Sequence, residues 1–116
     1  MPAYIVAQVE VRDPARYGEY MKHTPRVIAQ YGGRFIVRGG EMATLEGPDG
    51  PGRMVIIEFP SLEQAKAFYA SPEYAPVKAL RAGAGVGRFV VVEGYDPAAW
   101  SAVLAASQAI PLPPAV

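Results

Sequence analysis

Residues 47–59 have the sequence Gly-Pro-Asp-Gly-Pro-Gly-Arg-Met-Val-Ile-Ile-Glu-Phe, and this stretch decides the fold. Glycine and proline fill its first half, which therefore cannot form a helix or an inner strand. Its second half is rich in the β-branched and aromatic residues that are typical of strands. We predict a hairpin in which the turn joins a strand over residues 34–46 to a strand over residues 53–59. Gly39 and Gly40 predict a bulge or bend inside the first of these strands.

The residues before the hairpin predict a strand followed by a long helix. Residues 3–11 are nearly all apolar and rich in β-branched and aromatic side chains, which indicates a strand. Asp-Pro at 13–14 is a helix start signal, and Gly-Gly at 32–33 ends the helix. The apolar stripe of this helix consists of Tyr17, Tyr20, Met21, Thr24, Val27, Ile28 and Tyr31. Because proline removes a helical hydrogen bond, Pro25 predicts a kink near His23.

The residues after the hairpin predict two short helices and a last strand. Ser61 and Gln64 form a capping box that opens the first of these helices. Ser-Pro at 71–72 starts the second helix, and residues 88–93 predict the strand. The resulting order is strand-helix-strand-strand-helix-strand, with the second helical region split in two. This order is the ferredoxin-like arrangement of an α+β fold with an antiparallel four-stranded sheet.

Both faces of the predicted sheet are apolar. Val55 and Ile57 lie on one face of their strand, and Met54 and Ile56 lie on the other. Helices cover only one face of a ferredoxin-like sheet, so the second face would show polar alternation if it met water. We therefore expect a second subunit to cover that face, in a homodimer.

Composition excludes several classes of function. Eleven basic residues balance eleven acidic residues, so no net field attracts nucleic acid or an anionic membrane. The chain has no cysteine and thus no disulfide framework and no thiolate nucleophile. No apolar run approaches the roughly 18 residues of a membrane span. We expect a cytoplasmic protein that has neither nucleic acid nor a membrane as its partner.

Several short motifs occur in a specific order. They are Tyr-Gly-Gly-Arg at 31–34, Arg-Gly-Gly-Glu at 38–41, Leu-Glu-Gly at 45–47, Glu-Phe-Pro-Ser at 58–61, Ser-Pro-Glu-Tyr at 71–74, and Arg81. In these motifs the chain resembles the uncharacterised bacterial family called domain of unknown function 1330, in the dimeric α+β barrel superfamily. The resemblance covers about residues 3–94. It implies two ferredoxin-like sheets packed face to face in a dimeric α+β barrel, and it implies no established activity.

The C-terminal segment lies outside this resemblance. We expect residues 1–95 to form the ferredoxin-like barrel domain and residues 96–116 to form a helix and a proline-rich tail. Asp96 and Pro97 are the start signal of that helix. The apolar tail either docks on its own subunit or the partner subunit, or it frays as termini do.

His23 is the only histidine of the chain. Its unperturbed pKa lies near neutrality, so it is a candidate general base or haem ligand, against the simpler interpretation of a half-exposed helix residue. No second histidine or carboxylate lies at a spacing that is diagnostic of metal binding. We therefore expect no metal site and no cofactor.

Charged and tyrosine side chains on predicted buried elements supply the other site candidates. Charges there form ion pairs or point into a wet cavity, because an unpaired buried charge is costly. Arg38 is our candidate for holding an anion, since the glycines after it leave room for a carboxylate. Buried tyrosine hydroxyls need partners and suit a polar-lined pocket. The candidate ligand-binding residues are Tyr20, His23, Arg38, Glu41, Tyr69 and Arg81, and the catalytic residues remain unassigned.

Two hypotheses follow for function. The first is a pocket between sheet and helices that binds a small aromatic or carboxylate ligand, or converts it by cofactor-free oxidation or isomerisation. The second is a non-catalytic structural or regulatory dimer without pocket chemistry. The sequence favours the first only by analogy with the superfamily.

Overall fold

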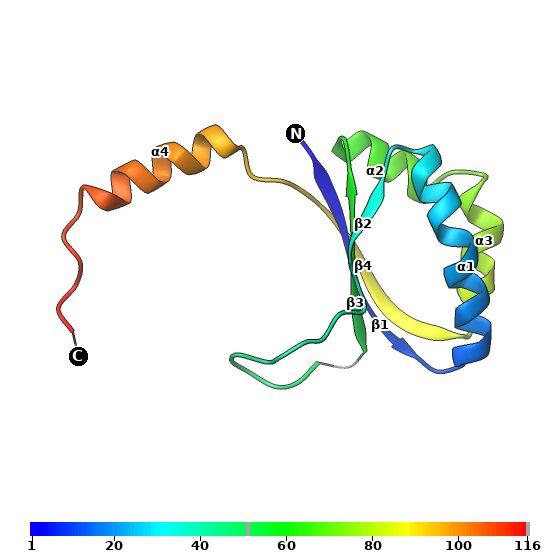
Figure 1. The fold of residues 1–116 in the computed structure, drawn as a ribbon. Helices are drawn as coiled ribbons and strands as arrows, with labels where there is room; N and C mark the ends of the chain where they lie inside the picture. The colour runs from blue at the N-terminus through cyan, green and yellow to red at the C-terminus, as the bar shows by residue number, and fades with distance from the viewer. Residues whose placement is uncertain (51, 116) are drawn as a thin grey trace.

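The computed structural model describes residues 1–50 and 52–115, and Figure 1 shows its arrangement. Pro51 of the predicted turn and Val116 of the predicted tail lie outside the described residues. The elements are β1 (Ala3–Val11), α1 (Pro14–Gln30), β2 (Arg34–Arg38), β3 (Arg53–Phe59), α2 (Leu62–Tyr69), α3 (Tyr74–Arg81), β4 (Gly85–Glu93) and α4 (Pro97–Gln108).

The sheet has the strand order β2-β3-β1-β4, and every neighbouring pair is antiparallel. Helices α1, α2 and α3 cover one of its faces, while α4 lies on the other side of the sheet (Figure 1). This arrangement confirms the predicted ferredoxin-like α+β fold. In the described residues no helix is long and apolar enough to cross a membrane.

The core lies between the sheet and α1–α3. Side chains of a strand alternate between its two faces, and β1 shows this alternation in its burial. Ile5 and Val9 of β1 are buried under the helices, and Val55 and Ile57 of β3 lie on the same side. The opposite face carries Tyr4, Val6, Met54, Ile56, Val90 and Val92. That open face is mostly apolar, as the sequence predicts.

The predicted strand over residues 34–46 is wrong in length and in the place of its bulge. Strand β2 ends at Arg38, and the register shift lies between Phe35 and Val37 rather than at the glycines. Gly39 has φ +69° and donates its N–H to the carbonyl of Met54 (2.8 Å). This left-handed conformation turns the chain out of the sheet, which is why the glycine pair ends the strand.

One further boundary differs from the prediction. Strand β4 begins at Gly85 rather than Arg88, so it includes Gly85 and Gly87. A Cβ on Gly87 would lie 2.8 Å from the carbonyl oxygen of Gln8, so glycine permits the close approach of β4 to β1. Helix α1 is continuous from Pro14 to Gln30 across Pro25.

Candidate functional site

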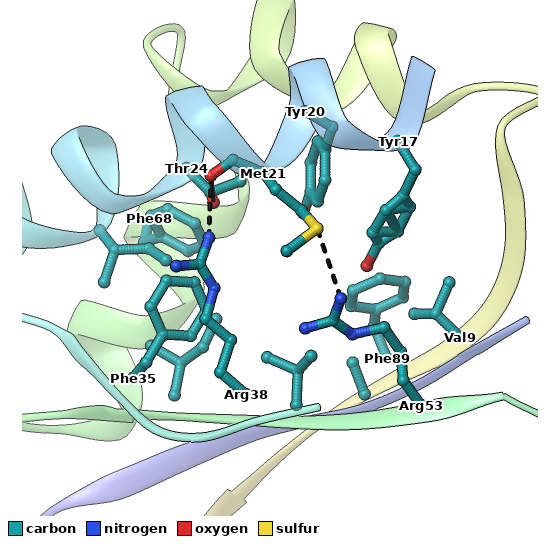
Figure 2. A pocket seen from close by; sticks show the side chains of 14 residues that line it. Val9, Tyr17, Tyr20, Met21, Thr24, Phe35, Arg38, Arg53, Phe68 and Phe89 are labelled. Atoms are coloured by element: carbon teal, nitrogen blue, oxygen red, sulfur yellow. Dashed lines mark hydrogen bonds between the residues drawn. The ribbon is translucent and has the colours of Figure 1, made fainter. Parts of the chain in front are cut away.

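A cavity of about 30 Å³ lies between α1 and the helix-facing side of β2 and β3, and it has room for about two water molecules (Figure 2). Figure 2 shows Arg38 and Arg53 rising from the sheet toward α1 with Met21 above them. The cavity is lined by Ala7, Val9, Tyr17, Tyr20, Met21, Thr24, Ile28, Phe35, Arg38, Arg53, Val55, Ile57, Phe68 and Phe89. In this lining the two arginines are the only charged residues.

The β-bulge in β2 places Arg38 at the cavity. Phe35 pairs with Ile57 and faces the helices, so an unbroken strand would aim residue 38 at the open face. The extra residue in the bulge reverses this alternation, and Arg38 pairs with Val55 on the helix-facing side. Its guanidinium stacks 4.3 Å from the centre of the Phe35 ring.

Pro25 supplies the hydrogen-bond acceptor for Arg38. In an α-helix the N–H of residue 25 would bond to the carbonyl of residue 21, and proline has no N–H. The freed carbonyl oxygen of Met21 accepts from Arg38 Nη2 at 2.8 Å and from Thr24 Oγ1 at 3.3 Å. The proline therefore creates a polar anchor in the cavity roof.

Arg53 enters the cavity from the first position of β3. Its Nη1 donates to the sulfur of Met21 at 3.3 Å, and its guanidinium lies 5.8 Å from the centre of the Tyr17 ring. Its Nε is buried and has no hydrogen-bond partner. A Cβ on Gly39 would lie 2.6 Å from Arg53 Nη2, so this glycine leaves the space that the guanidinium occupies. A thioether is a weak acceptor, so Arg53 is poorly satisfied.

Arg81 lies behind the cavity at the end of α3. Its guanidinium stacks 4.0 Å from the centre of the Phe89 ring and 5.6 Å from that of Tyr20. Its Nη2 donates to the hydroxyl of Tyr69 at 3.5 Å, and its Nε is buried without a partner. Burial acts to lower the pKa of Arg81, but the neighbouring tyrosines, Tyr74 foremost, raise it overall.

None of these three arginines forms an ion pair within the described residues. The ion pairs there join Arg12 to Glu10, Lys22 to Glu19, and Arg34 to Glu58. Glu58, on the neighbouring strand β3, pairs with Arg34 at 3.1 Å and not with Arg38. The site accumulates positive charge without a protein carboxylate to balance it.

The tyrosines of the site remain protonated. Tyr20 and Tyr74 share a buried hydrogen bond between their hydroxyls (2.7 Å), and burial raises the pKa of both. Burial also raises the pKa of Tyr17, against the opposing effect of Arg53, Arg81 and Arg38. These phenols are therefore hydrogen-bond donors and acceptors, and they are not bases at neutral pH.

The structure brings together part of the candidate set. Tyr20 and Arg38 line the cavity, and Arg81 and Tyr69 form a hydrogen-bonded pair beside it. Tyr69 also lines a separate cavity of about 310 Å³ between α2 and β4. His23 is exposed on α1, and Glu41 is exposed after β2. Neither is among the residues that line the first cavity.

Arg53 and Tyr17 belong to the site but were not among the candidates. The sequence does contain a signal for Arg53. Residues 53, 55 and 57 alternate along one strand, so Arg53 lies on the same helix-facing side as Val55 and Ile57. Across residues 1–50 and 52–115, no group of three or more metal-ligating His, Cys, Asp or Glu side chains is present.

Solved structures share the fold. A protein of unknown function from Rhodopseudomonas palustris is 21% identical, with a TM-score of 0.67 over 83% of this chain and 84% of that chain. A dimeric ferredoxin-like protein of unknown function from Jannaschia sp. CCS1 is 14% identical, with a TM-score of 0.63 over 81% and 100%. SnoaB, a cofactor-independent oxygenase from Streptomyces nogalater, is 15% identical, with a TM-score of 0.60 over 82% and 94%.

The sequence comparisons agree with the resemblance seen in the motifs. No curated protein sequence matches the chain significantly. The profile of the family described as Domain of unknown function (DUF1330) matches residues 2–95, which includes every element from β1 to β4. On that match, the chain belongs to the DUF1330 family.

Proposed function

We propose that the protein is a homodimer in which each subunit binds a small organic anion with an aromatic body. The cavity between α1 and the sheet is the binding site. The observation that carries this proposal is the pair Arg38 and Arg53, which line one cavity without a carboxylate partner.

The hydrogen bonds of these arginines leave guanidinium donors free for an anion. A guanidinium has five N–H donors arranged in a fork that matches a carboxylate. Arg53 gives one donor to a thioether sulfur and leaves Nε unsatisfied, although buried polar groups almost always find partners. A carboxylate placed between Arg38 and Arg53 supplies the acceptors and neutralises the charge that the fold concentrates there.

The size of the cavity limits which part of the ligand it holds. At about 30 Å³ the cavity accepts a carboxylate but not a whole ring. The ring of the ligand therefore requires the half-buried Met21 to turn outward, while Arg38 and Arg53 stay at the carboxylate. The guanidinium of Arg38 lies over the ring of Phe35, and that of Arg53 lies over the ring of Tyr17. Aromatic side chains that can contact the ring of a ligand are therefore adjacent to both charges.

The site supports binding better than proton abstraction. Its lining contains no histidine, aspartate or glutamate, and burial keeps the tyrosines protonated. Catalysis in such a site consists of stabilising an anion, such as the phenolate or enolate of a substrate, with the guanidiniums. The cofactor-independent oxygenase among the structural neighbours has the same fold, and this likeness motivates a test of turnover.

The open sheet face supports the homodimer. Its half-exposed apolar residues would form a large water-exposed patch in a monomer. Two neighbours of the same fold are described as dimeric.

Calorimetric titration of benzoate, 2-hydroxybenzoate and the neutral analogue benzyl alcohol tests the site. We expect the acids to bind and benzyl alcohol not to bind. Arg53→Met should weaken the acids by about 10- to 100-fold, the value of one charged hydrogen-bond pair. The control Arg26→Met changes an exposed arginine of α1 and should leave binding unchanged.

Two results contradict the proposal. One is that neither acid binds to the wild-type protein. The other is that the acids bind equally well to the Arg53→Met protein, which would place them elsewhere. Oxygen uptake in the presence of each bound acid then separates an enzyme from a binding protein.

A further inference from the structure

Residues 95–115 form an arm that the rest of the subunit does not cover. No residue of α4 is buried, and Tyr95, Trp100 and Leu112 expose 63%, 56% and 92% of their surfaces. No charged residue occurs from position 97 to position 116. Apolar side chains without charges are the composition of a buried segment, not of a solvated one.

The arm is ordered locally even though it is uncovered. Asp96 caps α4 by accepting from the N–H of Ala98 at 2.8 Å, and Pro97 occupies the first turn. A 12-residue helix is marginal in water by itself, so α4 needs a packing surface. The radius of gyration is 17.9 Å, against about 13 Å for a compact domain of this length, because the arm extends from the body.

The direction of the arm indicates where that surface is. Figure 1 shows α4 and the tail on the side of the sheet away from α1–α3. Residues 39–50, which follow β2, project to the same side. Both therefore reach past the open sheet face, where the second subunit of the proposed dimer would lie.

We propose that the arm, residues 95–115, packs on a second copy of this chain, so that the two subunits exchange arms. This inference rests on the proposed homodimer. The second copy is the fitting occupant because it already has to cover the apolar sheet face from which the arm extends. By twofold symmetry each subunit both gives an arm and receives one. The family profile ends at residue 95, so the exchange is an addition to the shared fold.

Trp100 is the only tryptophan of the chain and therefore reports on the arm directly. Its fluorescence is recorded over a dilution series in which light scattering measures the fraction of dimer. We expect the emission of a water-exposed indole in the monomer and blue-shifted emission in the dimer, with both signals following one curve. Exposed emission in the dimer, or shielded emission in the monomer, overturns the proposal.

Cross-linking identifies the subunit that receives the arm, and it does so even where the dimer never dissociates. Chains with Leu104→p-benzoylphenylalanine are labelled with ¹⁴N or ¹⁵N, mixed after unfolding and refolded together. We expect photo-adducts that join a light chain to a heavy chain. Adducts within single chains alone show that the arm folds back on its own subunit. If light scattering finds only monomer, the homodimer fails, and the arm proposal fails with it.

A matched pair of variants measures the contribution of the arm. Leu104 shares a helix face with Trp100, and Ala105 points away from that face. Leu104→Ser should weaken dimerisation by about 100- to 10,000-fold, because a symmetric dimer loses two buried leucines, each worth about 10- to 100-fold. Ala105→Ser adds the same hydroxyl on the opposite face and should leave the dimer constant unchanged. Equal dimer constants for Leu104→Ser and the wild type contradict the proposal.

Discussion

Replacing Arg53 by methionine should stabilise the ligand-free protein. The change keeps an apolar stem of similar length and removes the guanidinium. It removes a buried Nε that has no partner, and such a group costs about 1–3 kcal/mol. It also loses the cation–π contact with Tyr17, which is worth about 0.5–1 kcal/mol and is long here at 5.8 Å.

The difference is a gain of about 0.5–2 kcal/mol in the free energy of unfolding. Unfolding entropy scales with chain length, so this gain raises Tm by about 2–8 °C for 116 residues. Thermal denaturation at a fixed protein concentration, in a buffer without carboxylates or phosphate, measures it. The exposed Arg26→Met control should stay within about 0.5 kcal/mol of the wild type.

Ligand reverses the order of stability. At about 100 times its Kd a ligand stabilises the wild type by about 2.7 kcal/mol, whereas Arg53→Met should gain far less. The two melting curves should therefore exchange places when benzoate is added. If Arg53→Met instead destabilises the ligand-free protein by more than about 1 kcal/mol, Arg53 is a structural residue and the reasoning is refuted.

Two other changes follow from the same contacts. Pro25→Ala restores the N–H that bonds to the carbonyl of Met21, so urea denaturation should show a gain of about 1–2 kcal/mol in the free energy of unfolding. The gain is smaller than the roughly 3 kcal/mol that a proline costs inside a helix, because Arg38 already donates to that oxygen. No gain would mean that the oxygen is already fully satisfied. Burial raises the pKa of Tyr20 in the folded protein above its value of 10.0 in the unfolded chain. The protonated Tyr20 side chain therefore contributes its full stability below pH 10, and this stability is lost as the pH rises from 10 toward the pKa of the folded protein. Unfolding free energies of the wild type between pH 9 and pH 11 should fall more steeply than those of Tyr20→Phe, by up to about 1.4 kcal/mol per pH unit, and parallel curves would contradict the raised pKa.

The sequence predicts the fold well because its signals are repeated along the chain. The β-branched and aromatic residues of 3–11 and 53–59 and the start signals at Asp13 and Ser61 all agree with one topology, and the structure has these strands and helix starts. Such agreement between local and global preference makes a fold predictable. The open face follows from the same strands, since their second set of side chains is apolar.

The site is predicted less well because it depends on where regular structure breaks. Arg38 faces the cavity only because of a bulge in β2, and the residue types of β2 do not predict where that bulge lies. The glycines at 39–40 suggested a bulge at the wrong place, since Gly39 instead ends the strand. His23 is a candidate for its residue type and its place beside the predicted kink, but its side chain is exposed on α1 and does not line the cavity.

The irregularities themselves meet at one place, and this is the strongest reason to regard the cavity as functional. Pro25 frees the carbonyl that Arg38 uses, the β2 bulge turns Arg38 inward, and Gly39 leaves the space for Arg53. Each feature costs stability by itself, through a lost helical bond, a broken ladder or a glycine in place of a side chain. A core built only for stability would fill this space with leucine or phenylalanine. Three separate departures that hold two unpaired guanidiniums in one cavity support the proposed site for an anion that both arginines bind.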